Sequence, residues 1–251
     1  MGNYGKGFSF PEGGIIVNTE DYKMAENVLD AVSLFFQTRK EYVYIVDLSR
    51  GEIVFASENL CLLCDKTKEE IKEMGYEFYT RFIPEEDLKK IEELRQGAFE
   101  LFAHRNDIPK AQYCISFNFH FRPGKTKILF HHRAVPFMRD KDGHVWMVIC
   151  SFYPASQKDT GNAIIHCPTS PKYFQYDFQH REWVEQQKRE LTDNEKAIII
   201  LSAQGYTEKE IASITCKSHN TIKTYKRHLF DKIGVTNITG ALMYYLNHDL
   251  L

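Results

Sequence analysis

Residues 219–233 combine a regular apolar spacing with side chains that can read nucleic-acid bases. Ile222, Leu229 and Ile233 fall on one stripe of a helical wheel. The opposite face is basic or hydrogen-bonding and almost free of acid: Asn220, Lys223, Thr224 and Arg227. Lysine and arginine donate to guanine O6 and N7, and asparagine makes a bidentate pair with adenine. The pattern therefore predicts a helix whose outer face reads bases in the major groove of double-stranded DNA.

A second group of side chains suits contacts to the DNA backbone. It lies at the start or the flanks of this helix and at the start of the preceding one: Thr207, Lys209, Lys217, His219, Thr221 and Lys226. Free amides and the positive end of a helix dipole favour phosphate at a helix N-terminus. We therefore expect these residues to set the register on the duplex without reading its sequence.

Four helix signals within residues 191–251 would position these groups. The first three begin at capping residues, two of them in capping boxes: Thr192 with Glu195, Thr207 with Glu210, and Ser218. Gly205 and Gly234 suit helix ends, and Asn237 or Thr239 begins a fourth helix. Only four or five residues separate the second and third helices, which is typical of a helix-turn-helix.

The fourth helix carries an apolar stripe that includes Ala241, Leu242 and Tyr245. This stripe is wider than one side of so small a domain needs, and tyrosine is common at protein interfaces. We therefore predict a dimer contact through these three residues. Packing of the whole stripe against the first helix of the domain is the alternative.

Residues 191–241 also resemble the helix-turn-helix domain of LuxR-type regulators. The residues in register are Leu191, Thr192, Glu195, Gly205, Thr207, Lys209 to Ala212, Ser218, Thr221 to Lys223, Lys232 to Val235, and Ala241. The sequence departs from the family pattern at three positions. The family usually has His at the position of Tyr225, Asn or Arg at that of His228, and Arg at that of Ile238. The resemblance implies a sequence-specific transcription regulator that binds DNA as a homodimer.

The N-terminal part predicts one α+β domain. Residues 20–39 carry apolar residues at 24, 28, 32 and 35, the spacing of an amphipathic helix. A hairpin (42–46 and 53–55), several short helices and three strands between residues 114 and 153 follow. We therefore expect an N-terminal segment with a flanking helix at 1–40, a sensor domain at 41–155, a linker at 156–190 and the DNA-binding domain at 191–251. The linker composition leaves room for a short strand at 163–167 and a helix around Trp183.

The order of elements in 41–155 resembles a PAS domain. The E-N-L-x-x-L stretch from Glu58, the P-E-E-D-L segment from Pro84 and the D-K-D-G turn from Asp140 carry this resemblance. It implies a five-stranded antiparallel sheet with flanking helices, a pocket for an unknown small molecule, and dimerisation through residues 20–39. The predicted fold is thus α+β, followed by an all-α four-helix domain.

No cofactor or metal is identified from the sequence. The reactive-cysteine motif of flavin photosensors has no counterpart here. Haem ligation by one of four histidines is a minor alternative to surface or core roles for them: His104, His120, His131 and His132. Cys61 and Cys64 form a C-x-x-C in a leucine-rich segment, where buried thiols packing a helix face are favoured over zinc or redox chemistry.

Other functions are compatible with parts of the sequence. A quorum-sensing regulator that binds an acyl-homoserine lactone has this length and domain order, but its Trp, Tyr and Asp set is hard to find. A response regulator is disfavoured, because this sequence has no apolar strand that ends in the phosphoacceptor Asp of a receiver domain. An enzyme would need a site assembled from the same histidines and nearby acids, Glu85, Glu86 and Asp87, yet no spacing among them is mechanistic. We therefore expect no enzyme.

Composition is that of an ordinary globular protein. The chain has 251 residues, 43% of them hydrophobic and 26% charged, with a formal net charge of −2. This length suits two small domains, and the charge excludes a uniformly basic coat. Without a signal peptide or an apolar run that would cross a membrane, the sequence predicts a cytoplasmic protein whose six cysteines are reduced.

Overall fold

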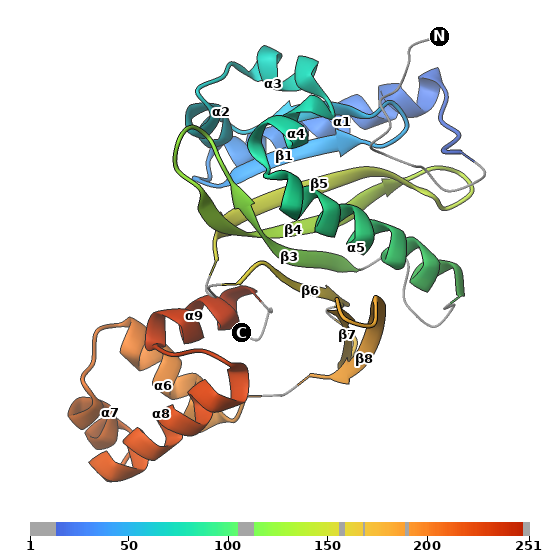
Figure 1. Ribbon diagram of the computed structural model, residues 1–251. Helices are drawn as coiled ribbons and strands as arrows, with labels where there is room; N and C mark the ends of the chain where they lie inside the picture. Colours follow the sequence, from blue (N-terminus) through green and yellow to red (C-terminus); the bar gives the residue numbers. More distant parts are fainter. Residues whose placement is uncertain (1–13, 105–112, 156–158, 168, 189–190, 248–251) are drawn as a thin grey trace. The chain divides into compact units, whose positions relative to one another are not determined.

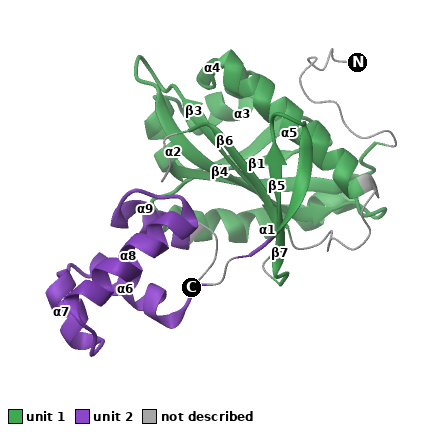
Figure 2. Ribbon diagram, turned by 60° about the horizontal axis from the view of Figure 1, so that its bottom comes forward, with its two compact units in different colours: residues 1–154, 159–186 green, residues 155–158, 187–251 purple. Residues whose placement is uncertain are grey.

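The chain forms two compact units. The computed structural model describes residues 14–104, 113–155, 159–167, 169–188 and 191–247 (Figure 1). One unit comprises residues 1–154 and 159–186, and the other comprises 155–158 and 187–251 (Figure 2). No helix in the described ranges combines the length and the apolar character that crossing a bilayer requires.

One eight-stranded sheet forms the centre of the first unit. Its strands are β1 (Tyr42–Asp47), β2 (Glu52–Ala56), β3 (Cys114–Phe121), β4 (Ile128–Arg139), β5 (Val145–Pro154), β6 (Gly161–His166), β7 (Lys172–Asp177) and β8 (Glu182–Gln187). They lie in the order β2-β1-β5-β4-β3-β6-β7-β8, and the pairings from β2 to β7 are antiparallel. The predicted five-stranded antiparallel sheet is therefore confirmed, and three further strands extend it.

Helix α1 (Thr19–Gln37) covers one face of the sheet. Alternate residues of β1, such as Val43 and Ile45, point to this face and pack against α1 residues that include Leu29 and Phe36. The predicted stripe only partly matches this contact. Residues 24, 28 and 35 are exposed instead, because α1 is apolar on two faces and the sheet covers one of them.

Four helices cover the other face of the sheet. They are α2 (Glu58–Cys64), α3 (Lys68–Met74), α4 (Glu77–Phe82) and α5 (Glu85–His104). The intervening residues of β1, Tyr44 and Val46, point to this side and join the main core. The predicted capping box of Thr67 with Glu70 is present at the start of α3. Figure 1 shows α5 crossing the sheet on this side.

The structure corrects the linker predicted at 156–190. Residues 161–166 form the predicted short strand, β6, which pairs with β3, but the helix expected around Trp183 is strand β8. Alternating burial in β7, where Phe174 and Tyr176 are buried and Gln175 is exposed, is the period of a half-buried strand. The polar, Pro- and Ser-rich composition of this segment is typical of a linker. The apolar residues that pack against it lie far away in the sequence, so no local pattern indicated these strands.

The second unit is the predicted all-α domain of four helices. They are α6 (Asp193–Ala203), α7 (Glu208–Ile214), α8 (His219–Ile233) and α9 (Ile238–Asn247). Both predicted capping boxes and the Ser218 cap are present. Gly205 (φ +92°) and Gly234 (φ +70°) hold left-handed backbone after α6 and α8, a conformation that favours glycine. Ile199, Ile211 and other apolar side chains of all four helices form one core.

Candidate nucleic-acid interface and buried cavity

Helix α8 is anchored on one side and open on the other. Ile222, Leu229 and Ile233 are buried in the core of the unit, with Ile222 1% and Leu229 0% exposed. The four predicted base-reading side chains are exposed: Asn220, Lys223, Thr224 and Arg227. The packed stripe thus fixes the helix rotation so that amide, hydroxyl and cationic groups share one accessible face.

Glu208 engages two of the predicted backbone contacts. Its carboxylate lies 3.2 Å from Lys226 Nζ and 3.3 Å from His219 Nε2. All three side chains are partly exposed, so this cluster ties the first turn of α7 to α8 while it remains near solvent. Glu208 is not among the site residues predicted from the sequence. Its position directly after the capping Thr207 was the available signal, because acids are favoured in a first helical turn.

The remaining predicted backbone contacts are on the surface near the same helix starts. Lys209 and Lys217 are exposed. The Thr207 hydroxyl donates to Glu210 at 2.7 Å, and the Thr221 hydroxyl is 2.8 Å from Ser218 Oγ. These two hydroxyls are therefore held in place by the caps that begin α7 and α8.

An ion pair fixes the far end of α8 to α6. Lys232 Nζ donates to Glu195 at 2.9 Å, and both side chains are mostly buried. Burial pushes the pKa of Glu195 upward, but hydrogen bonds from Lys232 and from the Thr192 backbone and hydroxyl together lower it. The carboxylate thus serves two helices, since it also closes the capping box of α6.

The position of α9 contradicts part of the predicted dimer contact. Ala241 (0% exposed) and Tyr245 (2% exposed) lie in the core of their own unit, so they offer no surface to a second chain. Leu242 is partly exposed. Asn237 begins the helix, accepting a hydrogen bond from the Gly240 amide at 2.8 Å. The stripe is wide because α9 packs against both α6 and α8.

The first unit contains a partly open cavity of about 190 Å³ between the sheet and α5. Its walls come from β1, β3, β4, β5, α4 and α5 and are mostly carbon. Apolar lining residues include Val46, Ile83, Ile91, Leu94, Ala98, Phe99, Phe102, Ile115, Phe117, Phe119, Ala134 and Val148. The pocket implied by the PAS resemblance therefore has a counterpart in this unit.

The polar groups that line this cavity include four uncharged side chains. The Tyr44 hydroxyl is 3.1 Å from His132 Nε2, and the His132 ring stacks on Phe117 with centroids 4.7 Å apart. Burial lowers the pKa of His132 to about 3, so its imidazole is neutral at physiological pH. Burial likewise raises the pKa of Cys150 to about 12 and those of Tyr44 and Tyr79 well above their usual range.

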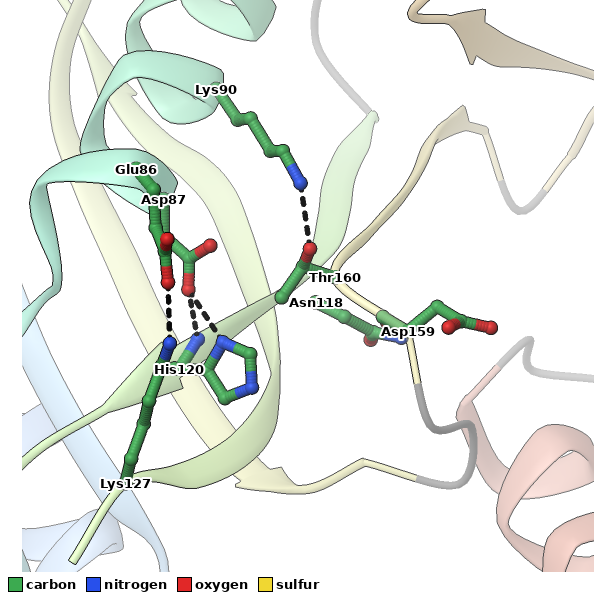
Figure 3. Close-up of polar contacts among 8 residues, drawn as sticks. All are labelled: Glu86, Asp87, Lys90, Asn118, His120, Lys127, Asp159 and Thr160. Atoms are coloured by element: carbon green, nitrogen blue, oxygen red, sulfur yellow. Dashed lines mark hydrogen bonds and ion pairs between the residues drawn. The ribbon is translucent and has the colours of Figure 1, made fainter.

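The histidines considered for haem or catalysis do not converge on one site. His132 faces the cavity, whereas its neighbour His131 faces the other side of β4 and lies 2.7 Å from Asn118 Oδ1. His120 Nδ1 is 2.9 Å from Asp87, which also accepts from the His120 amide (Figure 3). The side chain of His104 lies outside the described residues.

The acids beside His120 already have partners. Glu86, Asp87 and His120 bring ligand-type atoms within 4.8 Å of one another. However, Glu86 pairs with Lys127, and Glu85 pairs with Lys89 at 2.8 Å. One carboxylate oxygen of the buried Asp87 (3% exposed) contacts both the backbone amide and Nδ1 of His120. This group therefore fastens the start of α5 to β3.

Cys61 and Cys64 lie on one buried side of α2 and contribute to the main core. Burial raises the pKa of both thiols, that of Cys64 to about 12. Neutral, buried thiols are poor nucleophiles and poor metal ligands. This geometry fits the packing interpretation of the C-x-x-C pair.

Known proteins resemble different parts of this chain. Residues 189–245 match the family described as "Bacterial regulatory proteins, luxR family". The response regulator protein VraR of Staphylococcus aureus and that of Staphylococcus epidermidis are each 42% identical over 64 residues. This match covers 24% of the chain and 29% of each relative, so the chain spans less than a third of their length.

Solved structures give weaker likenesses. A VqmA dimer of Vibrio cholerae is 18% identical, covers 88% of both chains and has a TM-score of 0.33. The PAS domain of Bordetella pertussis BvgS is 11% identical, covers 53% of this chain and 89% of its own, and has a TM-score of 0.34. Scores this low do not establish a shared architecture. The sequence match and the four capped helices do identify the C-terminal segment: residues 189–245 form a LuxR-family domain of the kind found in bacterial regulatory proteins.

Proposed function

We propose that this chain regulates transcription by binding a specific double-stranded DNA sequence through α8. The main support is the exposed face of α8, which the buried stripe on the opposite side holds toward solvent. This face carries Asn220, Lys223, Thr224 and Arg227. Donors of these types match the acceptor patterns of base edges in the major groove. The exposed N-terminal half of α8 is the part that a helix-turn-helix brings to the bases.

The test replaces Lys223 or Arg227 by Ala in the full chain. Its probe is a duplex selected from a random library with the wild-type chain. Each substitution should weaken binding to the selected duplex by about 1–3 kcal/mol and relax the preference at one base position. Asp231→Ala, which removes an acid from the same helix, serves as the matched control and should not weaken binding. Equal losses on selected and random duplexes would assign the residue to phosphate instead.

We expect the phosphate contacts at the starts of α7 and α8. Thr207, Lys209 and Thr221 lie at or beside the first turns of α7 and α8, where unpaired amides favour anions. Lys217 also adds an exposed cation there, whereas His219 and Lys226 would first have to leave Glu208. Lys209→Ala should weaken binding to every duplex alike and reduce the salt slope by about one. An unchanged slope would remove Lys209 from the interface.

The proposed signal is a small uncharged molecule bound in the cavity of the first unit. An apolar cavity of about 150 Å³ is known to hold benzene, so about 190 Å³ accommodates one substituted ring. His132, Tyr44, Tyr79 and Cys150 offer hydrogen bonds from uncharged groups. A cation, Arg95, also lines the cavity, but its guanidinium is already paired with Glu92. Among the described residues that line this cavity there is neither Trp nor Asp, which supports a ligand other than an acyl-homoserine lactone.

This ligand class can be tested with 4-methylphenol and the equally sized anion 4-methylbenzoate. The phenol should raise the midpoint of thermal unfolding of the full chain, because a ligand that binds only the folded state stabilises it. The benzoate should not, because its carboxylate would be buried beside uncharged groups and an Arg95 that is already paired with Glu92. A variant with a filled cavity, Ala134→Phe, should lose the response to the phenol. Stabilisation by the benzoate alone would contradict the proposal.

We place a homodimer contact on the exposed side of α1. Met24 and Phe35 are 65% and 56% exposed, and Val28 and Ala31 lie exposed between them. Their spacing of 4, 3 and 4 residues is that of a heptad seam. Two such chains would present two recognition helices to a two-fold DNA site. The partly exposed Leu242 is the remaining candidate on α9.

Analytical ultracentrifugation of the full chain tests this contact. Val28→Glu and Phe35→Glu should weaken dimerisation at least about tenfold, since each places a charge in a buried apolar seam. Lys23→Glu, which adds an acid outside the seam of the same helix, should leave it unchanged. A dimer that survives both seam substitutions but not Leu242→Glu would move the interface to α9.

A further inference from the structure

Helix α5 has two occupied faces. On one face, Leu94, Ala98 and Phe102 line the cavity. On an adjoining face, Lys90, Glu93 and Gly97 meet the segment that contains β6, β7 and β8. One rigid helix therefore separates the space proposed for the ligand from the last strands of the unit.

The contact between α5 and the β7–β8 hairpin is tight. A Cβ atom added at Gly97 would lie 3.1 Å from Tyr176 Cε2 and 3.2 Å from Trp183 Nε1, closer than ordinary packing. The Tyr176 hydroxyl donates to Glu93 at 3.0 Å, and the Tyr176 and Trp183 rings meet edge to face at 5.0 Å. Because these side chains are closely packed, a displacement of the helix has to displace Tyr176 and Trp183 as well.

The segment that leads into the hairpin is tied to α5 and β3 as well. Lys90 Nζ donates to Thr160 Oγ1 at 2.7 Å, and Asn118 Nδ2 donates to the Asp159 carbonyl at 3.1 Å (Figure 3). Gly161 follows with φ +87°, and a Cβ there would lie 2.8 Å from the Phe178 ring. The contact with α5 is thus fixed at both Thr160 and Trp183.

We propose that α5 transmits occupancy of the cavity to the β7–β8 hairpin and so changes the DNA affinity of the second unit. This inference rests on the proposed function and names the device that regulates it. A molecule between the sheet and α5 pushes on Leu94 and Ala98, and the tight Gly97 contact passes the shift to Trp183. Strand β8 ends at Gln187, only a few residues before α6 begins at Asp193, so the hairpin is the last element before the DNA-binding helices. Packed interfaces of this kind shift between discrete arrangements rather than deforming gradually.

The first test observes Trp183 without any ligand. The full chain labelled with 5-fluorotryptophan has two ¹⁹F resonances, because Trp146 and Trp183 are its two tryptophans. Ala134→Phe fills the cavity from β4, away from the hairpin, and should shift the Trp183 resonance. Trp146 packs on α1 at the other face of the sheet, where its Nε1 donates to Asp47, and its resonance should stay in place.

Val135→Phe is the matched control, because it adds the same ring at the next, exposed position of β4. It should leave Trp183 unmoved. If Ala134→Phe fails to fold, the smaller Ala134→Leu takes its place, and 4-methylphenol gives an independent filling of the cavity. A Trp183 resonance that ignores the filled cavity would overturn the coupling.

The second test connects the hairpin to DNA. Ala134→Phe should change the affinity for the selected duplex by about fivefold or more, a common size for a coupling between sites. Trp183→Ala should reduce that change to less than about twofold, whereas Glu182→Ala, on an exposed side chain of the same strand, should preserve it. An undiminished change in Trp183→Ala would refute the route through the hairpin. If 4-methylphenol fails to bind while these variants behave as expected, only the proposed ligand class fails.

Discussion

The two units of this chain build their candidate sites in opposite ways. The DNA-binding face belongs to one helix, α8, and every signal that positions it lies within a few residues: a cap, a buried stripe and a closing glycine. The cavity of the first unit takes its walls from six elements between Tyr44 and Cys150. A surface site is thus fixed by local periodicity, whereas an interior site depends on how distant elements pack.

The largest expected effect separates the two units energetically. Leu229→Ala should lower the free energy of unfolding of the second unit by about 2–5 kcal/mol, because it empties a fully buried position. Urea unfolding followed by far-UV circular dichroism measures this loss. Both tryptophans lie in the first unit, so the midpoint seen by tryptophan fluorescence should not move. An equal shift of both midpoints would mean that the units unfold as one.

A pH effect of intermediate size is expected in the first unit. Burial holds the pKa of His132 at about 3 in the folded chain, while the unfolded chain takes up this proton near pH 6.5. Between these values the unfolded state binds more protons, so stability is full above pH 6.5 and falls as the pH drops toward 3. The slope from this group is at most about 1.4 kcal/mol per pH unit.

The test compares His132→Phe with the wild type by fluorescence-detected urea unfolding from pH 7 to pH 4.5. Phenylalanine keeps the ring on Phe117 but does not titrate. The variant should therefore depend less on pH than the wild type. Identical slopes would show that His132 becomes protonated in the folded cavity wall.

The smallest effect concerns the acid that faces the DNA-binding helix. Glu208→Gln should tighten binding to all duplexes by about 0.5–1 kcal/mol, because it releases Lys226 and His219 and removes a negative charge near phosphate. The matched control is Glu210→Gln, which removes the same charge but keeps a residue that can complete the capping box. Weaker binding of the Glu208 variant would show that this acid orients Lys226 for its contact.

Some expectations failed because apolar character alone does not say which face is covered. In α1 the predicted stripe included residues 24, 28 and 35, yet the sheet packs on Leu29 and Phe36. In α9 the width of the stripe suggested a partner chain, yet Ala241 and Tyr245 fill the core of their own unit. Both helices are apolar on more than one face, and only their neighbours decide which face is buried.

Local sequence signals were sufficient to predict the elements whose energetics are local. Capping boxes, glycine ends and a 3.6-residue apolar period placed α6, α7 and α8 and the outward side of α8, because these signals act within one or two helical turns. Three features became known only from the folded chain: β6, β7 and β8 extend the sheet, Glu208 pairs with Lys226, and Trp183 packs against Gly97 of α5. Each of these contacts joins residues far apart in the chain or on different elements, so its free energy exists only once the fold has brought them together.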